Sequence, residues 1–130
     1  MKHLKTILFM IVLALTVGLV GCRTVGVYNV DQSPIDVSAK ATLSDIKKSI
    51  MRSGAQLGWQ MKETEPGVIT GTLHVRKHMA QVKIPYSKTS YSILYNDSAE
   101  LNYDGTNIHK RYNTWIMNLD RSIQANLSIL

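Results

Sequence analysis

Residues 69–84 read ITGTLHVRKHMAQVKI, and apolar and polar side chains alternate along both halves of this stretch. Successive side chains of a β-strand point to opposite faces, so each half predicts a strand with one apolar and one polar face. The basic residues between the halves predict a turn. The stretch therefore indicates an antiparallel hairpin whose sheet has one buried side and one wet side.

Two further runs with the same alternation flank this hairpin. One begins at Trp59 and ends before a Pro66-Gly67 turn, and the other covers Ser90–Tyr95. Short connections make a four-stranded antiparallel meander the simplest arrangement. Pro85 has no amide donor for a sheet, so it predicts either the end of the third strand or a bulge.

A helix is expected on each side of these strands. Thr42 and Asp45 have the spacing of a capping box and predict the start of the first helix, for which Gly54 and Gly58 are stop signals. Its apolar stripe consists of Leu43, Ile46 and Ile50. The second helix is expected from about Ile108, capped by Thr106 or Asn107. Its stripe consists of Ile108, Tyr112, Trp115, Ile116, Leu119, Ile123 and Leu127.

These elements predict a two-layer α+β domain over residues 42–130, in the order α-β-β-β-β-α. Both helices are expected to pack on one face of the four-stranded sheet. Residues 23–41 are interpreted as a tether, because Gly26, Ser33 and Pro34 interrupt any regular pattern. Val25, Val27 and Val30 leave open a short edge strand within this segment.

The amino terminus has the pattern of an export signal. Lys2 and Lys5 precede an uncharged apolar run from Ile7 to Val20, which is short for a membrane-spanning helix of about 20 residues. The run ends in Leu19-Val20-Gly21-Cys22, which resembles a bacterial lipobox. The resemblance implies a signal peptide over residues 1–21, cleavage between Gly21 and Cys22, and a diacylglycerol and an N-acyl chain on Cys22. An uncleaved amino-terminal helix is the alternative.

Cys22 is the single cysteine of the chain. An exported protein with one free thiol in an oxidising compartment is an unfavourable arrangement, and a thioether to lipid removes it. Arg23 rather than aspartate follows Cys22. By resemblance to Gram-negative sorting rules, this favours the outer membrane, with residues 22–41 anchoring the domain on the periplasmic side.

The charge of the chain does not require a polyanionic partner. Of the 15 basic and 9 acidic residues, Lys2 and Lys5 leave with the signal, which reduces the net charge from +6 to +4. The periplasmic compartment, not the charge, excludes nucleic acid. The basic residues Arg76, Lys77, His78, Lys83 and Lys88 are interpreted either as a solvated rim or as a contact for lipopolysaccharide, phospholipid or peptidoglycan.

Several residues form a recurring pattern that resembles a family of small, largely uncharacterised Gram-negative lipoproteins. They are Gly58-Trp59, Pro66-Gly67, Ser90-Tyr91-Ser92-Ile93, Tyr95, Asp97-Ser98, Leu101, Tyr103, Ile108-His109, Tyr112-Asn113, Trp115 and Leu119. The resemblance covers about the last 90 residues and the lipobox. It implies a periplasmic lipoprotein and supplies no catalytic residue. The layout also resembles the helix-and-sheet modules of outer-membrane assembly lipoproteins, an analogy of fold alone.

Two groups of residues have the chemistry of a metal site or a hydrolase. His74 and His78 lie four residues apart, but if Leu73 faces Ala80 the two imidazoles leave opposite faces of the hairpin, and a shared metal is not expected. Asp97, Ser98, Asp104 and His109 supply the residue types of a triad without a nucleophile turn. Turn and cap chemistry is the favoured interpretation, so we expect neither catalysis nor a cofactor besides the lipid.

An aromatic corner is the remaining candidate site, and it consists of Tyr91, Tyr95, Tyr103, His109, Tyr112, Asn113 and Trp115. It is interpreted either as core with satisfied polar tips or as a groove for a small envelope ligand such as a peptide, sugar or lipid headgroup. His109 is expected in the first helical turn, where the helix dipole disfavours its protonated form. The leading hypothesis for function is a non-catalytic, lipid-anchored module that binds another envelope protein. Binding is expected at a strand edge or at the wet sheet face made by Thr70, Thr72, Gln81, Lys83, Ser90 and Ser92.

Overall fold

The hairpin expected at residues 69–84 forms with the expected register in the computed structural model, which describes residues 23–130. Strand β4 (Val68–Val75) pairs antiparallel with β5 (His78–Pro85), and Leu73 lies opposite Ala80. Strand β5 ends at Pro85, the residue that has no amide hydrogen to donate to a ladder. The signal peptide, Gly21 and Cys22 lie outside the described residues.

The fold is α+β, and its main sheet has five antiparallel strands instead of the expected four. Strands β3 (Gln60–Glu65), β4, β5 and β6 (Ser90–Ala99) form the expected meander. Strand β2 (Val30–Pro34) adds to β6 and gives the order β2-β6-β5-β4-β3. A separate two-stranded sheet joins β1 (Thr24–Gly26) to β7 (Asn107–His109).

The expectation that residues 23–41 form a tether is therefore wrong for residues 24–34. The edge strand that the valines left open is what forms, because Val30 is buried opposite Ile93 and the Gln32 amide donates to Ser92 Oγ at 2.9 Å. The two strands are short, and β2 carries a bulge between Val30 and Ser33. Short, irregular edge strands give little local periodicity, which is why the sequence pattern indicated a strand here only as an alternative.

Helix α2 (Leu43–Gln56) begins with the expected capping box. Thr42 Oγ1 accepts from the Asp45 amide at 3.1 Å, and Asp45 Oδ2 accepts from the Thr42 amide at 2.8 Å. Leu43 does not belong to the buried stripe, since 42 % of it is exposed. Gly54 lies inside the helix and does not stop it; a Cβ there would overlap the Met61 side chain of β3.

Helix α3 (Lys110–Leu127) begins later than expected. His109, not Thr106 or Asn107, caps it, and His109 Nδ1 accepts from the Arg111 amide at 3.1 Å. Ile108 belongs to β7 and pairs with Val25. The rest of the expected stripe faces the core, with Trp115 only partly buried.

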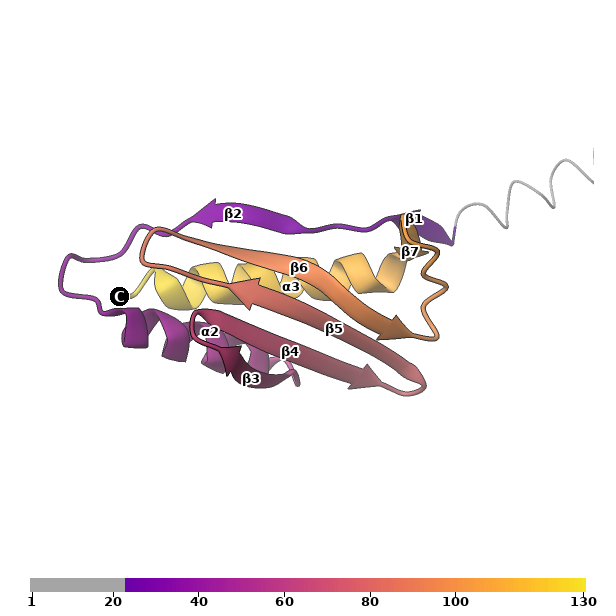
Figure 1. The fold of residues 1–130 in the computed structure, drawn as a ribbon, viewed down its shortest axis with the longest axis horizontal. Helices are drawn as coiled ribbons and strands as arrows, with labels where there is room; N and C mark the ends of the chain where they lie inside the picture. The colour runs from indigo at the N-terminus through magenta and orange to yellow at the C-terminus, as the bar shows by residue number, and fades with distance from the viewer. Residues whose placement is uncertain (1–22) are drawn as a thin grey trace, which may run out of the picture.

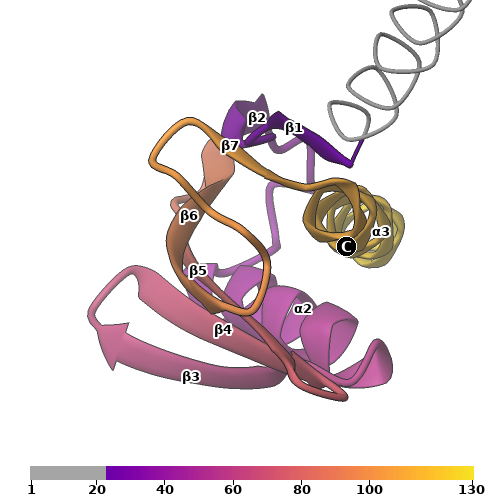
Figure 2. The same cartoon turned by 90° about the vertical axis from the view of Figure 1, so that its right-hand side faces the viewer.

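The five-stranded sheet curves around α2 and α3, which lie side by side (Figures 1 and 2). The core between the sheet and the two helices contains Ile46 and Ile50 of α2, Ile116 and Ile123 of α3 and the apolar face of the sheet. The buried Ser53 hydroxyl joins the two helices by donating to the Ser49 and Ser122 carbonyls at 2.7 and 3.2 Å. Between residues 23 and 130, no helix is both long enough and apolar enough to cross a bilayer.

Candidate functional site

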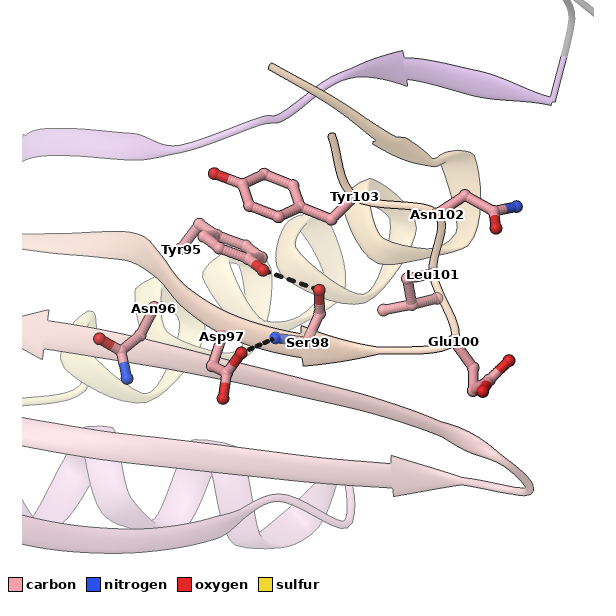
Figure 3. A pocket seen from close by; sticks show the side chains of 8 residues that line it. All are labelled: Tyr95, Asn96, Asp97, Ser98, Glu100, Leu101, Asn102 and Tyr103. Carbon is pink, nitrogen blue, oxygen red and sulfur yellow. Dashed lines mark hydrogen bonds between the residues drawn. The ribbon is translucent and has the colours of Figure 1, made fainter. Parts of the chain in front are cut away.

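An open groove of about 720 Å³ lies beside the end of β6 and the loop after it (Figure 3). We call it the tyrosine groove. Its lining is Tyr95, Asn96, Asp97, Ser98, Glu100, Leu101, Asn102 and Tyr103. These residues are nearly continuous in sequence, so the shape of the groove depends on the local path of the backbone.

That path is set by a bulge and by two residues with left-handed backbone geometry. Gln81 pairs with Asp97 and Val82 with Tyr95, so Asn96 is the extra residue on β6. Glu100 and Asn102 have φ angles of 59° and 54°, and the buried Leu101 between them fixes the loop on the core. Left-handed geometry at non-glycine residues is uncommon and marks a backbone held by its surroundings.

Two tyrosines, Tyr95 and Tyr103, line the groove, and a third, the buried Tyr112, packs against Tyr95. The rings of Tyr95 and Tyr103 stack with centroids 4.1 Å apart, and Tyr112 meets Tyr95 edge-on at 5.7 Å. Tyr95 Oη and Ser98 Oγ share a hydrogen bond of 2.7 Å (Figure 3). Burial raises the pKa of both Tyr95 and Tyr112, so these phenols stay protonated at neutral pH.

The Tyr112 hydroxyl is buried and has no hydrogen-bond partner among the described residues. Leaving a buried hydroxyl unpaired costs about 1–3 kcal/mol. Tyr112 is 0 % exposed and meets Tyr95 edge-on, so its ring lies on the buried side of the tyrosine stack.

The expected aromatic corner is split in the structure. Tyr95, Tyr103 and Tyr112 come together, but His109 and Trp115 lie near His78, with ring centroids 6.2 and 6.3 Å from its ring. His109 is not among the residues that line the tyrosine groove. The sequence did not link His78 to this corner, since the hairpin turn that delivers it is distant along the chain.

Tyr91 and Asn113 have structural roles away from the groove. Tyr91 is buried, donates to Asp120 and borders a smaller hollow of about 340 Å³ near the end of α3. Burial, and then its bond to Asp120, raise the pKa of Tyr91 to about 12. Asn113 holds the chain between β1 and β2 by donating to the Gly26 carbonyl at 2.9 Å and accepting from the Tyr28 amide at 3.0 Å.

His109 has a pKa below its usual range. Burial is the largest cause, followed by the positive charges of Arg111, His78, Lys110 and Arg23. The direction agrees with the expectation, but the causes are burial and neighbouring charge instead of the helix dipole, and His109 is the N-cap of α3 instead of a residue of its first turn. As a neutral ring, His109 can accept the Arg111 amide and cap the helix.

The two histidines of the hairpin do not converge. His74 lies opposite Met79 and His78 opposite Val75, as expected, and His74 is exposed while His78 Nδ1 donates to the Glu100 carbonyl at 2.7 Å. Within residues 23–130 no three His, Cys, Asp or Glu side chains are grouped as metal ligands.

Asp97 and Asp104, the acidic residues that could supply a catalytic triad, form hydrogen bonds within local turns. Asp97 Oδ1 accepts from the Ser98 amide at 2.8 Å, and Asp104 Oδ1 accepts from the Asn107 and Thr106 amides at 2.7 and 2.9 Å. These backbone bonds lower the pKa of Asp104, because they favour its charged form. The structure does not bring Asp97, Ser98, Asp104 and His109 together as a catalytic group.

The expected basic cluster is divided between two ends of the sheet. Arg76 and Lys77 form the β4–β5 turn, whereas Lys88 lies in the β5–β6 turn and Lys83 on the strand between. The eight residues of β5 separate these turns, at about 3.3 Å per residue. All four side chains are exposed, but they do not form one patch.

The expected wet sheet face is present with one exception. Ser92 is only 2 % exposed and its hydroxyl accepts from the Gln32 amide, because β2 covers this part of β6. Across the other strands, Gln81 donates to Thr72 at 3.2 Å and accepts from Asn96 at 2.6 Å. This ladder of side chains connects the wet face to the tyrosine groove, since Asn96 belongs to both.

Comparison with known proteins returned no matching family model, no matching curated protein and no matching solved structure.

Proposed function

We propose that this chain is a lipid-anchored periplasmic protein of the outer membrane, similar to the small Gram-negative lipoproteins, that binds another envelope protein without catalysing a reaction. The lipobox supports the anchor, with Cys22 as the acylated residue. The tyrosine groove supports binding. We propose it as the site where a segment of the partner lies, and we propose no cofactor and no nucleic-acid partner.

The observation that carries this proposal is the character of the groove. It is open and its lining is mainly polar, with one face of stacked tyrosine exposed: Tyr103 is 41 % exposed. Sites for small molecules are typically enclosed and apolar, whereas tyrosine and amide side chains are common in interfaces between proteins. An open groove of this kind suits a polypeptide segment better than a sequestered small molecule.

The surroundings of the groove extend the surface available to a partner. The Thr72–Gln81–Asn96 ladder continues from the groove over the wet face of β4, β5 and β6. The outer edges of the sheet suit a partner less. Strand β3 carries Lys62 and a bulge between Glu63 and Glu65, and β2 contains Pro34 and a bulge, features that oppose the addition of a strand.

The proposal is tested by site-specific photo-crosslinking of the full-length chain in its native envelope. A photoreactive residue in place of Asn102 should give one discrete crosslinked product with a partner protein, and one in place of Lys62 on β3 should not. Tyr103→Ala should then lower the yield of that product about tenfold, because exposed tyrosines that become buried often dominate binding energy.

Met117→Ala is the matched control, since Met117 is 39 % exposed and lies outside the groove. Its yield should equal that of the parent chain. No product from any groove position, or an equal loss with Met117→Ala and Tyr103→Ala, would contradict the assignment of the groove.

A second candidate function is the binding of a small envelope ligand such as a sugar or a short peptide. The buried Tyr112 hydroxyl without a described partner, behind an exposed tyrosine ring, favours it. Titration with peptidoglycan fragments, followed by NMR, should shift amides of residues 95–103 if this function is correct. Unchanged amide shifts at saturating concentration would exclude those fragments as ligands.

A further inference from the structure

One end of the molecule gathers five basic residues, which we call the basic end: Arg23, Arg76, Lys77, Lys110 and Arg111. Figure 1 shows β1, β7, the start of α3 and the β4–β5 turn at this same end. All five residues are exposed. The group was not evident from the sequence, because its members come from three distant segments.

Direct contacts hold these segments together. The Lys110 amide donates to the Arg23 carbonyl at 3.3 Å, which fixes the first described residue to the start of α3. The β4–β5 turn is joined to them through His78, whose ring centroid lies 6.2 Å from that of His109 and whose Nδ1 donates to the Glu100 carbonyl. The five charges therefore belong to one rigid surface.

These charges are not neutralised within the described part of the chain. The ion pair found among residues 23–130 joins Lys47 to Glu63, and it involves none of the five. Glu100 and Asp104 are the nearby carboxylates along the loop, and Asp104 is already bonded to two backbone amides. The basic end thus presents a net positive surface to an external partner.

Exposed apolar side chains accompany the charges. Val25, which is 38 % exposed, lies in β1 two residues from Arg23, and Tyr28, which is 40 % exposed, follows that strand. Tyrosine beside basic residues is typical of surfaces that meet lipid headgroups, because its ring is apolar and its hydroxyl stays hydrated. A solvated rim requires the charges alone and does not account for these side chains.

We infer that the basic end docks on the anionic phospholipid headgroups of the membrane that holds the anchor. The inference rests on the proposed lipid on Cys22. Arg23 follows Cys22 directly and β1 begins at Thr24, so the anchor is one peptide unit, about 3.8 Å, from the described domain. With almost no linker, the surface nearest residue 22 faces the bilayer, and this surface is the basic end.

The test uses the full-length lipidated chain in nanodiscs of phosphatidylcholine alone or of equimolar phosphatidylcholine and phosphatidylglycerol, each with a gadolinium chelate on a few headgroups. Paramagnetic broadening of the Lys77 amide reports docking, because Lys77 lies on the hairpin and far from the anchor along the chain. Strong broadening on the anionic discs and weak broadening on the neutral discs is the expected result.

A variant with Arg76, Lys77, Lys110 and Arg111 all replaced by Gln should lose most of this broadening. Each basic residue near an anionic surface favours binding about fivefold, so the docking equilibrium should fall by about a hundredfold or more. The matched control replaces Lys48, Lys62, Lys83 and Lys88 by Gln, which removes the same charge elsewhere. The control should dock like the parent chain.

The intact mass of the same samples distinguishes a failure of this inference from a failure of the proposed lipid anchor. If Cys22 carries lipid but Lys77 broadens equally on both discs, or both variants lose docking equally, the inference is wrong and the anchor stands. If Cys22 carries no lipid, the proposed anchor and the inference that rests on it both fail.

Discussion

Tyr112 combines full burial with a hydroxyl that no described residue bonds. Removal of that hydroxyl should therefore cost nothing in folding. We expect Tyr112→Phe to leave the free energy of unfolding unchanged or to raise it by about 1 kcal/mol, measured by urea denaturation.

Tyr91→Phe is the control for Tyr112→Phe, because the Tyr91 hydroxyl donates to Asp120. Its loss should destabilise the fold by about 1–3 kcal/mol. A destabilisation of similar size in Tyr112→Phe would show that its hydroxyl is bonded and would weaken the case for a ligand there.

His109 makes the stability of the fold depend on pH. Its pKa is lowered in the folded protein from an ordinary value of 6.5, so the unfolded chain binds the proton more readily than the folded one. Its contribution to stability is present above pH 6.5 and is lost as the pH falls through the lowered value. Acidification should also weaken the cap of α3, since a protonated ring cannot accept the Arg111 amide.

The variant His109→Asn keeps a capping side chain and removes the titration. Its free energy of unfolding should fall less than that of the parent chain when the pH is lowered from about 7 to about 5, the range in which histidine titrates. His74→Asn, at an exposed histidine, should retain the parent profile. If His74→Asn flattened the pH profile and His109→Asn kept the parent profile, His109 would not be the source of the pH dependence.

At the scale of elements, Gly54 allows α2 to approach β3. An added Cβ overlaps the Met61 side chain, so Gly54→Ala should destabilise the fold although alanine favours helix formation. We expect a net loss of at most about 2 kcal/mol, from overpacking of about 1–3 offset by about 1 of helix propensity. Thermal and urea unfolding measure it.

Gly26 provides the control for Gly54, because no described atom lies within 4 Å of the position that a Cβ would take there. Gly26→Ala should change stability little. Replacing Met61 by Ala in the Gly54→Ala background should recover part of the loss, since it frees the space that the new Cβ needs. Strictly additive effects of the two substitutions would refute the contact as the cause.

The helices and strands also show which parts of the fold can be predicted from a local sequence pattern. The meander β3–β6, the capping box of α2 and the core stripe of α3 follow from alternation, spacing and cap chemistry within short windows. Strand β7 was missed, and a strand in the region of β1 and β2 was left only as an alternative, because their pairing joins distant residues, as when Val25 meets Ile108. Three-residue strands carry too little periodicity to reveal such pairing.

The candidate site was predicted only in part for a similar reason. Tyr95, Tyr103 and Tyr112 were grouped from their residue type and approximate position, and they do meet. The bulge at Asn96 and the left-handed backbone at Glu100 and Asn102 shape the groove, and neither has an alternation signal. Asparagine is enriched at such positions, so Asn102 gave the single clue that composition offers.

At the scale of the whole molecule, residues 24–34 belong to the folded domain instead of forming a tether, which leaves little chain between the domain and Cys22. Described secondary structure begins at Thr24, two residues after Cys22. If Cys22 carries the proposed lipid, a domain held so close to its anchor has little freedom to turn, and its basic end and tyrosine groove would then have defined orientations relative to the membrane. The proposed function depends on the proposed lipid anchor at Cys22.

The mass of the native protein tests the proposed lipid on Cys22 most directly. Intact mass spectrometry of the full-length product, recovered from envelopes with detergent, should show a chain that begins at Cys22 and carries a diacylglycerol and an amide-linked acyl chain. A free thiol at Cys22, or a chain that retains residues 1–21, would contradict the account.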